Sequence, residues 1–589
     1  MQALVEARRA PARRGLRRCA LGGVRRRVRA HAWALGVLLG SLGVALGLSC
    51  AGPLPDTCDE LGTCGPGDAG PVDAGDGRGA NAMTDGAADV AMDGCDPTKD
   101  PKDEPCVLDN AYGVFVASPV GVDGGTDAGE GGLGSGSGDG SMSQPYSTIA
   151  QALASLGSKT RIYVCNGLYG EPVSVTTAVS VYGGLSCAAG SAGPVWTYVG
   201  GSAQVSSPSS AVALSVTGVS SGVVTVEDVS FAAPDATAPG GSSIAALIAF
   251  SSVHLVRVTL SAGSGANGAA GADGLMNPNY AGSAPAGKAQ VWTTVNGLFG
   301  PVSGGAGGVN DCKQLGSSAG GDGGLGCVGS VGTAGTSNPQ APVTTPGRDG
   351  LAMGPVDGGP AIAANDPGAD GLPGDGGVAA PVQLYGTLSP SGWVPSAGGD
   401  GALGNPGQGG AGATDPLLNQ CTVATQDIGG GGGGSGGCGG AGGAGGGGGG
   451  ASIALASVGS TIDLTGSTLL AAAAGTGGPG GAGEDGQAGA PGGDDSSFSG
   501  LHAAGGVGGN GAGGSGGAGG IGGISAGIVE SGSRITVDPT TSTKPGNPGA
   551  GGTAGPGGRY APGILMTGMD GHPGASGSAG TAVAVLSLM

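Results

Sequence analysis

Glycine recurs at every third position over long stretches of this 589-residue chain. The blocks that keep this period are 265–274, 320–335, 398–410, 477–492, 505–523, 546–558 and 568–580. Three residues per turn is the repeat of polyproline II-type helices, and glycine on one edge lets neighbouring backbones bond to each other. The period therefore predicts packed polyglycine II helices. Flexible loops are the alternative, because an ordered glycine loses much backbone entropy.

Composition narrows the fold classes. Glycine accounts for 142 residues and proline for only 38, so the chain is not a strict collagen. Aromatic residues make up 3% of the chain, which excludes a large aromatic core. The nearly pure glycine stretch that begins at Gly429 passes directly into ASIALA at 451–456, a β-like segment. A disordered, collagen-like coat is a third interpretation of such a chain.

The N-terminus has the features of an export signal, residues 1–49. Ten arginines lie between Arg8 and Arg29, and an apolar run follows at 32–49. GLSC, ending at Cys50, resembles the lipoprotein box of bacteria, although Gly47 stands where that family has leucine. The resemblance implies that Cys50 receives lipid, and Ala51 implies sorting to the outer membrane. Plain secretion is the alternative.

Charge and cysteines agree with export. Beyond residue 49 the chain keeps 12 basic and 41 acidic residues, a net charge of −29, which argues against nucleic-acid partners. The remaining cysteines fall in neighbouring couples, and the absence of CxxC pairs favours disulfides over zinc. The expected pairs are Cys58 with Cys64, Cys95 with Cys106, Cys165 with Cys187, Cys312 with Cys327, and Cys421 with Cys438.

The chain beyond the signal divides by pattern. Residues 50–106 are rich in Asp and Gly and are predicted to form a disordered tether. In the next segment, Thr148 and Gln151 form a capping box for a short helix, and short alternating runs such as RIYVC at 161–165 predict strands. The predicted parts are 1–49, 50–106, β-strand rungs at 107–262, glycine-rich repeats at 263–450, and rungs alternating with glycine repeats at 451–589.

Two resemblances add to this pattern. PYSTI at 145–149, IYVCNGLYGEPVSV ending at Val175, and VSVYGG ending at Gly184 resemble the N-terminal rungs of pectin-lyase-like proteins. That resemblance implies an all-β, right-handed parallel β-helix with a capping helix, in which Cys165 and Cys187 tie neighbouring rungs. The glycine blocks are similar in composition to PE-PGRS surface proteins.

The residues that carry chemistry are few. Glu227 and Asp228 are adjacent on a predicted strand, so we expect them on opposite faces, and Arg257 is expected on a strand face near His254. His502 and His572 lie in glycine-rich runs, and the GEDG cluster at 483–486 lacks the register of calcium repeats. Only Trp196, Trp292 and Trp393 remain as aromatic platforms for sugars. We therefore expect no catalytic residue, metal or cofactor.

These features predict an exported, lipid-anchored protein of the cell surface or outer membrane with a structural or adhesive role. Its expected partners are the membrane, through the lipid, and extracellular polysaccharide or other surface proteins. The alternative is a β-helix polysaccharide lyase or hydrolase acting outside the cell. A cleft with converging carboxylates beside Arg257 would favour that alternative.

Overall fold

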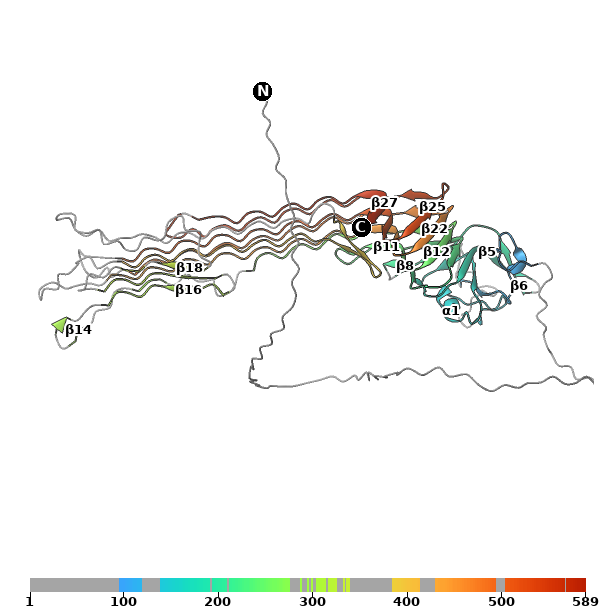
Figure 1. Ribbon diagram of the computed structural model, residues 1–589, viewed down its shortest axis with the longest axis horizontal. Coiled ribbons are helices and arrows are strands. Elements are labelled where there is room, and N and C mark those ends of the chain that lie inside the picture. Colours follow the sequence, from blue (N-terminus) through green and yellow to red (C-terminus); the bar gives the residue numbers. More distant parts are fainter. Residues whose placement is uncertain are drawn as a thin grey trace, which may run out of the picture. The chain divides into compact units, whose positions relative to one another are not determined.

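The computed structural model is nearly all-β, and most of its strands form parallel sheets (Figure 1). The chain divides into the units Met1–Gly86 and Ala87–Met589, and every described residue belongs to the second. The structure describes residues 95–118, 138–190, 193–208, 211–275, 286–288, 294–295, 298–299, 303–313, 316–325, 332–333, 335–338, 384–413, 430–493, 504–566 and 568–588. The predicted signal, Cys50, Cys58 and Cys64 lie outside these residues.

Three parallel sheets, here called A, B and C, build the strand-rich part of this unit. Sheet A runs in the spatial order β1 (Gly113–Val116), β2 (Arg161–Cys165), β5 (Ser180–Gly190), β9 (Val224–Glu227), β12 (Ser252–Val256), β22 (Thr461–Thr465), β25 (Arg534–Val537). Sheet B runs β3 (Leu168–Tyr169), β7 (Ala203–Ser206), β10 (Val229–Ala232), β13 (Thr259–Ser261), β23 (Thr468–Leu470), β26 (Ser542–Lys544). Sheet C runs β4 (Val173–Val175), β8 (Val212–Thr217), β11 (Ser243–Ala249), β21 (Ser452–Val458), β24 (Ser525–Ser531), β27 (Ala582–Leu588).

The chain visits these sheets in a fixed rotation, C then A then B, as in β11, β12 and β13. Alternation along each strand sends one set of side chains inward: in β12, Val253 and Leu255 are buried, whereas His254 is only partly covered. The inward side chains form one hydrophobic cluster shared by all three sheets. Stacked valine, isoleucine and leucine thus provide the core that the few aromatic residues do not.

A short helix, α1 (Ile149–Ala154), closes one end of this core. Thr148 caps it as predicted, because Thr148 Oγ1 accepts a hydrogen bond from Gln151 N at 3.2 Å. Ile149 and Ala152 are buried in the cluster shared by the sheets. Among the described residues, the remaining helical element is the single turn η1 (Pro105–Val107), and no helix there is long and apolar enough to cross a membrane.

Sheets A and C are also covered on their outer faces. A hairpin of β19 (Gly386–Ser389) and β20 (Gly392–Pro395) places Trp393 against Ile244 and Leu247 of sheet C. Residues 95–112, with β6 (Gly193–Tyr198), lie over the first strands of sheet A, where Phe115 packs on Tyr163. Tyr163 donates to Val107 O. Residues 95–106 were expected in the tether, but here they are part of the folded unit.

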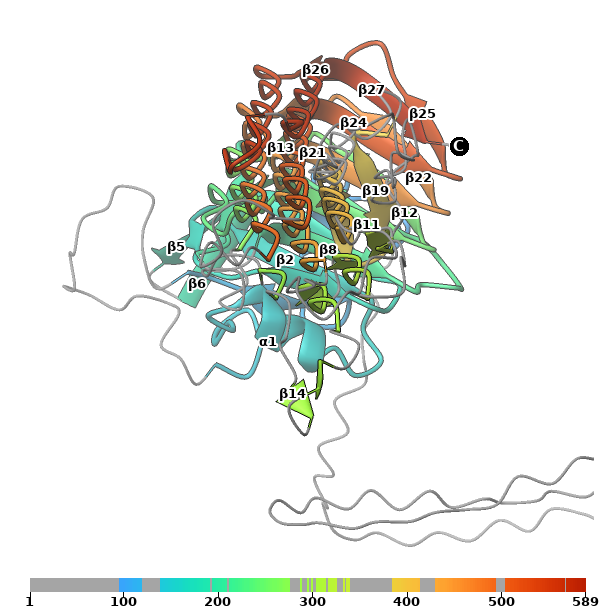
Figure 2. The ribbon, with the colours of Figure 1, turned by 90° about the vertical axis from the view of Figure 1, so that its left-hand side faces the viewer.

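The glycine blocks leave the stack after a strand of sheet B and return before the next strand of sheet C. One excursion lies between β13 and β21, a second between β23 and β24, and a third between β26 and β27. The first also holds the antiparallel pair β14 (Thr294–Val295) and β15 (Leu298–Phe299), and the antiparallel set β16 (Val309–Asp311), β17 (Ser317–Ala319) and β18 (Thr336–Asn338). Segments from all three excursions run side by side (Figures 1 and 2).

Backbone hydrogen bonds join these segments into a glycine bundle, defined as 263–274, 398–413, 430–450, 475–493, 505–523, 546–559 and 568–580. Segment 505–523 shows the pattern. Every third amide from Gly508 to Gly523 donates to segment 475–493, those from Gly506 to Ala518 donate to segment 398–413, and those from Gly513 to Gly522 donate to segment 568–580. Successive residues therefore bond to different neighbours, which is what three residues per turn permits.

Buried serines fix where each excursion leaves the stack. Ser452 Oγ, at the start of β21, donates to Gly263 O at 2.7 Å and accepts from Ala472 N at 2.8 Å. Ser525 makes the same contacts one turn later, to Ala472 O and Gly546 N. These hydroxyl groups satisfy backbone atoms at the junction between strand and glycine segment, where the parallel ladder ends.

Candidate functional site

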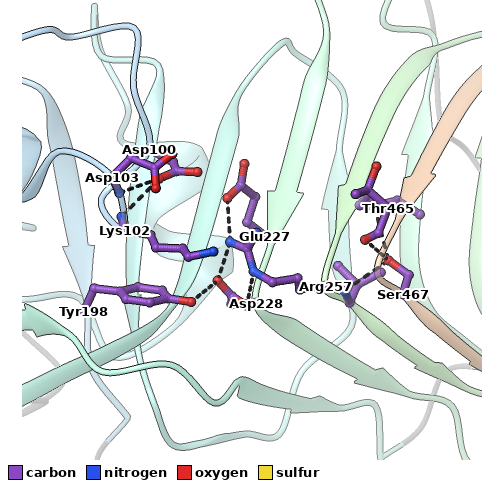
Figure 3. Close-up of polar contacts among 11 residues, drawn as sticks. Asp100, Lys102, Asp103, Tyr198, Glu227, Asp228, Arg257, Thr465 and Ser467 are labelled. Atoms are coloured by element: carbon purple, nitrogen blue, oxygen red, sulfur yellow. Dashed lines mark hydrogen bonds and ion pairs between the residues drawn. The ribbon is translucent and has the colours of Figure 1, made fainter. Parts of the chain in front are cut away.

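The clearest cluster of ionisable side chains lies at a corner between sheets A and B (Figure 3). Glu227 ends β9, Asp228 stands between β9 and β10, and Arg257 occupies the same corner one turn later, between β12 and β13. Asp228 and Arg257 have φ values of 54° and 53°, the left-handed region that L residues other than glycine adopt rarely. In the following turn the corner residue is Gly466, with φ 58°.

Both carboxylates contact the Arg257 guanidinium. Nε and Nη2 of Arg257 donate to Asp228 at 2.9 and 2.8 Å, and Nη2 also donates to Glu227 Oε2 at 3.1 Å. The hydroxyl group of Tyr198 donates to Asp228 Oδ2 at 3.1 Å. The prediction that Glu227 and Asp228 face opposite ways is therefore wrong. The strand ends at Glu227, and the left-handed turn at Asp228 brings its side chain to the same guanidinium.

Burial sets the electrostatics of the cluster. It raises the pKa of Glu227 to about 7, the nearby Asp100 carboxylate adds to this rise, and Arg257 opposes it. The hydrogen bond to Asp228 raises the pKa of Arg257, and burial raises the pKa of Tyr198. Figure 3 shows Asp100 on the covering loop, beside the Glu227 carboxylate. Glu227 thus exchanges a proton near neutral pH.

The Glu227 and Asp228 carboxylates are both paired with Arg257, which differs from the arrangement of carboxyl groups in a glycosidase. A glycosidase requires two carboxyl groups separated across a sugar bond, whereas Glu227 and Asp228 share one guanidinium. A described cavity lies elsewhere, beside α1, and none of its lining residues belongs to the cluster. There Glu171 accepts from Ile149 N at 2.7 Å and Ala150 N at 3.0 Å, so its carboxylate caps the helix. Burial raises the pKa of Glu171, and the two N–H donors oppose that rise.

His254 does not join the cluster. Its Nε2 lies 3.1 Å from Asp463 Oδ2, its partner in register on β22, and both side chains are 46% exposed. This surface pair contributes little to stability, because solvent screens it. His572 is exposed and its backbone carbonyl accepts from Gly516 N, whereas His502 lies outside the described residues.

The cysteines form three bridges among the described residues. Cys95 bonds to Cys106 and Cys165 to Cys187, the pairs that spacing favours, and the second joins β2 to β5. Cys438 bonds to Cys312, 126 residues away in the chain. The expected pairs of Cys312 with Cys327 and of Cys421 with Cys438 are therefore wrong, because the fold brings segment 430–450 beside β16. Cys327 and Cys421 lie outside the described residues.

The remaining candidate ligands are also engaged in structure. Trp196 donates to Met142 O at 3.1 Å, and Trp393 is buried between its own hairpin and sheet C, so neither presents a platform for a sugar. Trp292 is outside the described residues. In the GEDG cluster, Glu484 accepts from Ala441 N at 3.0 Å and Asp485 accepts from Arg559 N at 2.6 Å. Each acidic side chain thus satisfies an amide of a neighbouring glycine segment.

One grouping in the described part of the chain has metal-ligand spacing: Cys95, Glu104 and Cys106. Its two sulfur atoms are bonded to each other, so they do not offer thiolate ligands. Asp100, which lies near Glu227, and Tyr198, which bonds to Asp228, were missed. The similar alternating runs VTVED at 224–228 and VHLVR at 253–257 could have aligned Asp228 with Arg257, but no local signal places the 95–106 loop over them. No protein-family model matches this chain, and comparison with curated proteins and solved structures finds no similar protein.

Proposed function

We propose that this chain is an exported cell-surface protein with a structural or adhesive role and no catalytic activity. Lipid on Cys50 anchors it in the outer membrane, and residues from Cys50 toward Cys95 form the tether. Its strand-rich part is a right-handed parallel β-helix, and its glycine bundle consists of packed polyglycine II helices inserted between rungs. The body projects from the cell and meets extracellular polysaccharide or other surface proteins.

The hydrogen bonding of segment 505–523 carries this proposal. All three sets of its amides are engaged by different neighbours at 2.8–3.1 Å. A bundle held through its backbone needs no aromatic core and keeps side chains of the outer segments free for contact. Exposed Thr476, Thr553 and Arg559 exemplify those side chains. Such a body suits a rigid support or an extended adhesive surface.

A second candidate, a polysaccharide lyase or hydrolase, rests on Glu227. A carboxyl group whose pKa is about 7 suits general acid or base catalysis at neutral pH. The ion pairs with Arg257 favour a structural role instead. The test incubates the purified protein and its Glu227→Gln variant with extracellular polysaccharides and measures new reducing or unsaturated ends. Release by the unmodified protein that the variant loses would establish the enzyme and refute the structural proposal.

The anchor has its own test in a bacterial host. Cells fed a palmitate analogue should label the unmodified protein and the Cys19→Ser variant, but not Cys50→Ser. The Cys50→Ser protein should also leave the membrane fraction, because one thiol accepts the lipid. Protease added to intact cells should remove the anchored body from the surface. Labelling that persists in Cys50→Ser would contradict the anchor.

A further inference from the structure

At the end of the strand stack opposite α1, the described residues leave the core open. Edge strands β25, β26 and β27 terminate sheets A, B and C, and Figure 2 draws them together at one end. Inside the stack, Leu464 and Ile528 are each 1% exposed. Their partners in the terminal turn are Val537, which is 42% exposed, and Val585, which is 50% exposed. The stacked apolar side chains of the core are therefore exposed to solvent at this end.

The free edge belongs to a strand suited to pairing. β27 has the sequence AVAVLSL, without charge or proline, and pairs with β24 along its other edge. Among the described residues no strand pairs with the outer edge of β27. Native sheets protect such edges with charges, bulges or covering segments, because an uncharged β-prone edge is a template for another strand. Solenoids likewise require a cap at each end.

The charges of the terminal turn indicate which partner can bind to this end of the stack. Residues 524–588 hold three basic residues, Arg534, Lys544 and Arg559, and three acidic residues, Glu530, Asp538 and Asp570. The whole chain, by contrast, carries a net charge of −20. The terminal turn thus carries no net charge, so a second copy of this acidic protein can approach it without net repulsion.

We propose that β27 and the open core end are a docking surface for a second copy of this chain. The two copies meet end to end about a twofold axis, with their β27 strands antiparallel. Head-to-tail stacking is blocked, because α1 fills the opposite core end with Ile149 and Ala152. The contact therefore closes as a dimer and does not propagate into a filament. At the cell surface this joins two projecting bodies through their terminal turns.

Sedimentation velocity on purified full chain tests the proposal, with Cys50→Ser in every sample so that no lipid contributes to association. The expected result is a dimer whose dissociation constant rises at least about tenfold in Val585→Glu, since the buried charge has no partner. Val195→Glu is the matched control, because Val195 is 53% exposed on β6, remote from this end. It should remain dimeric.

Cysteine cross-linking covers the case in which Val585→Glu does not fold. Val585 is the central residue of β27, so an antiparallel pair brings the two copies of this position near the axis. Val585→Cys should give a covalent dimer on oxidation, and Val195→Cys should not. A monomeric parent protein, a dimer indifferent to both Val585 substitutions, or a growing polymer would each overturn the proposal.

Discussion

Substituting neighbouring residues of segment 430–450 tests whether the glycine bundle is packed. A Cβ on Gly443 would lie 2.1 Å from Gly481 O, and one on Gly445 would lie 2.0 Å from Gly398 O. Ala444, between them, already carries a Cβ. Because ordinary contacts begin near 3.4 Å, each new methyl group must push backbone away by more than 1 Å. Those backbones are held by bonds such as Gly443 N to Ser515 O, 2.9 Å.

We expect Gly443→Ala and Gly445→Ala each to cost about 2–4 kcal/mol, from overpacking and weakened hydrogen bonds. Ala444→Gly should cost at most about 1 kcal/mol, mainly through backbone entropy. In a flexible linker the order reverses, since Gly→Ala there is neutral or favourable. Pulse proteolysis across a urea series measures the intact fraction of the three variants. Gly443→Ala and Gly445→Ala as resistant as the parent would refute packing.

Three further changes follow from the described contacts. Raising the pH from 5 to 8 should lower the free energy of unfolding by about 1–3 kcal/mol, because the pKa of Glu227 is about 7 in the folded protein and ordinarily 4.5. Protonated Glu227 favours the folded state. This contribution is complete below pH 4.5 and is lost as the pH rises through 7. Urea midpoints at both pH values measure this, and Glu227→Gln should flatten the difference. Peptide mapping without reduction should recover Cys438 linked to Cys312, and Cys438→Ala should cost about 2–4 kcal/mol in urea unfolding; a peptide linking it to Cys421 would contradict the structure. Ser452→Ala should cost about 1–3 kcal/mol in the same assay by leaving Ala472 N and Gly263 O unpaired, and an unchanged midpoint would count against the serine junction.

Local sequence patterns predicted the strands and the helix better than they predicted which segments contact one another. Alternation identified segments such as RIYVC, and the capping box identified α1, because both depend on residues close in sequence. The all-β class is likewise confirmed. Period-three glycine marked the excursions, and the sequence carries a finer signal: Ser435, Cys438, Ala441 and Ala444 occupy one frame of the stretch at 430–450, and glycine fills the other two up to Gly446. At the glycines of those two frames, an added Cβ would collide with the backbone of a neighbouring segment.

The features that were predicted wrongly depend on contacts between residues far apart in the sequence. The partner of Cys438 depends on which segments of the first excursion meet, and the shorter loop to Cys421 gave the wrong answer. Glu227 and Asp228 looked like opposed strand residues because alternation continues until the chain turns. The turn occurs at Asp228 with a left-handed φ that aspartate adopts less readily than glycine, and Arg257 lies against it from the next turn.

Native-state hydrogen exchange of the glycine segments tests the packed bundle most directly. Peptides from 505–523 should be protected at nearly every amide, comparably to the flanking strand β24, because three sets of amides bond to three neighbours. Segment 263–274, at the edge, should retain beyond Ala266 only the amides of Gly268, Gly271 and Gly274. Exchange of both segments at the rate of an unstructured chain, while β24 stays protected, would contradict the account.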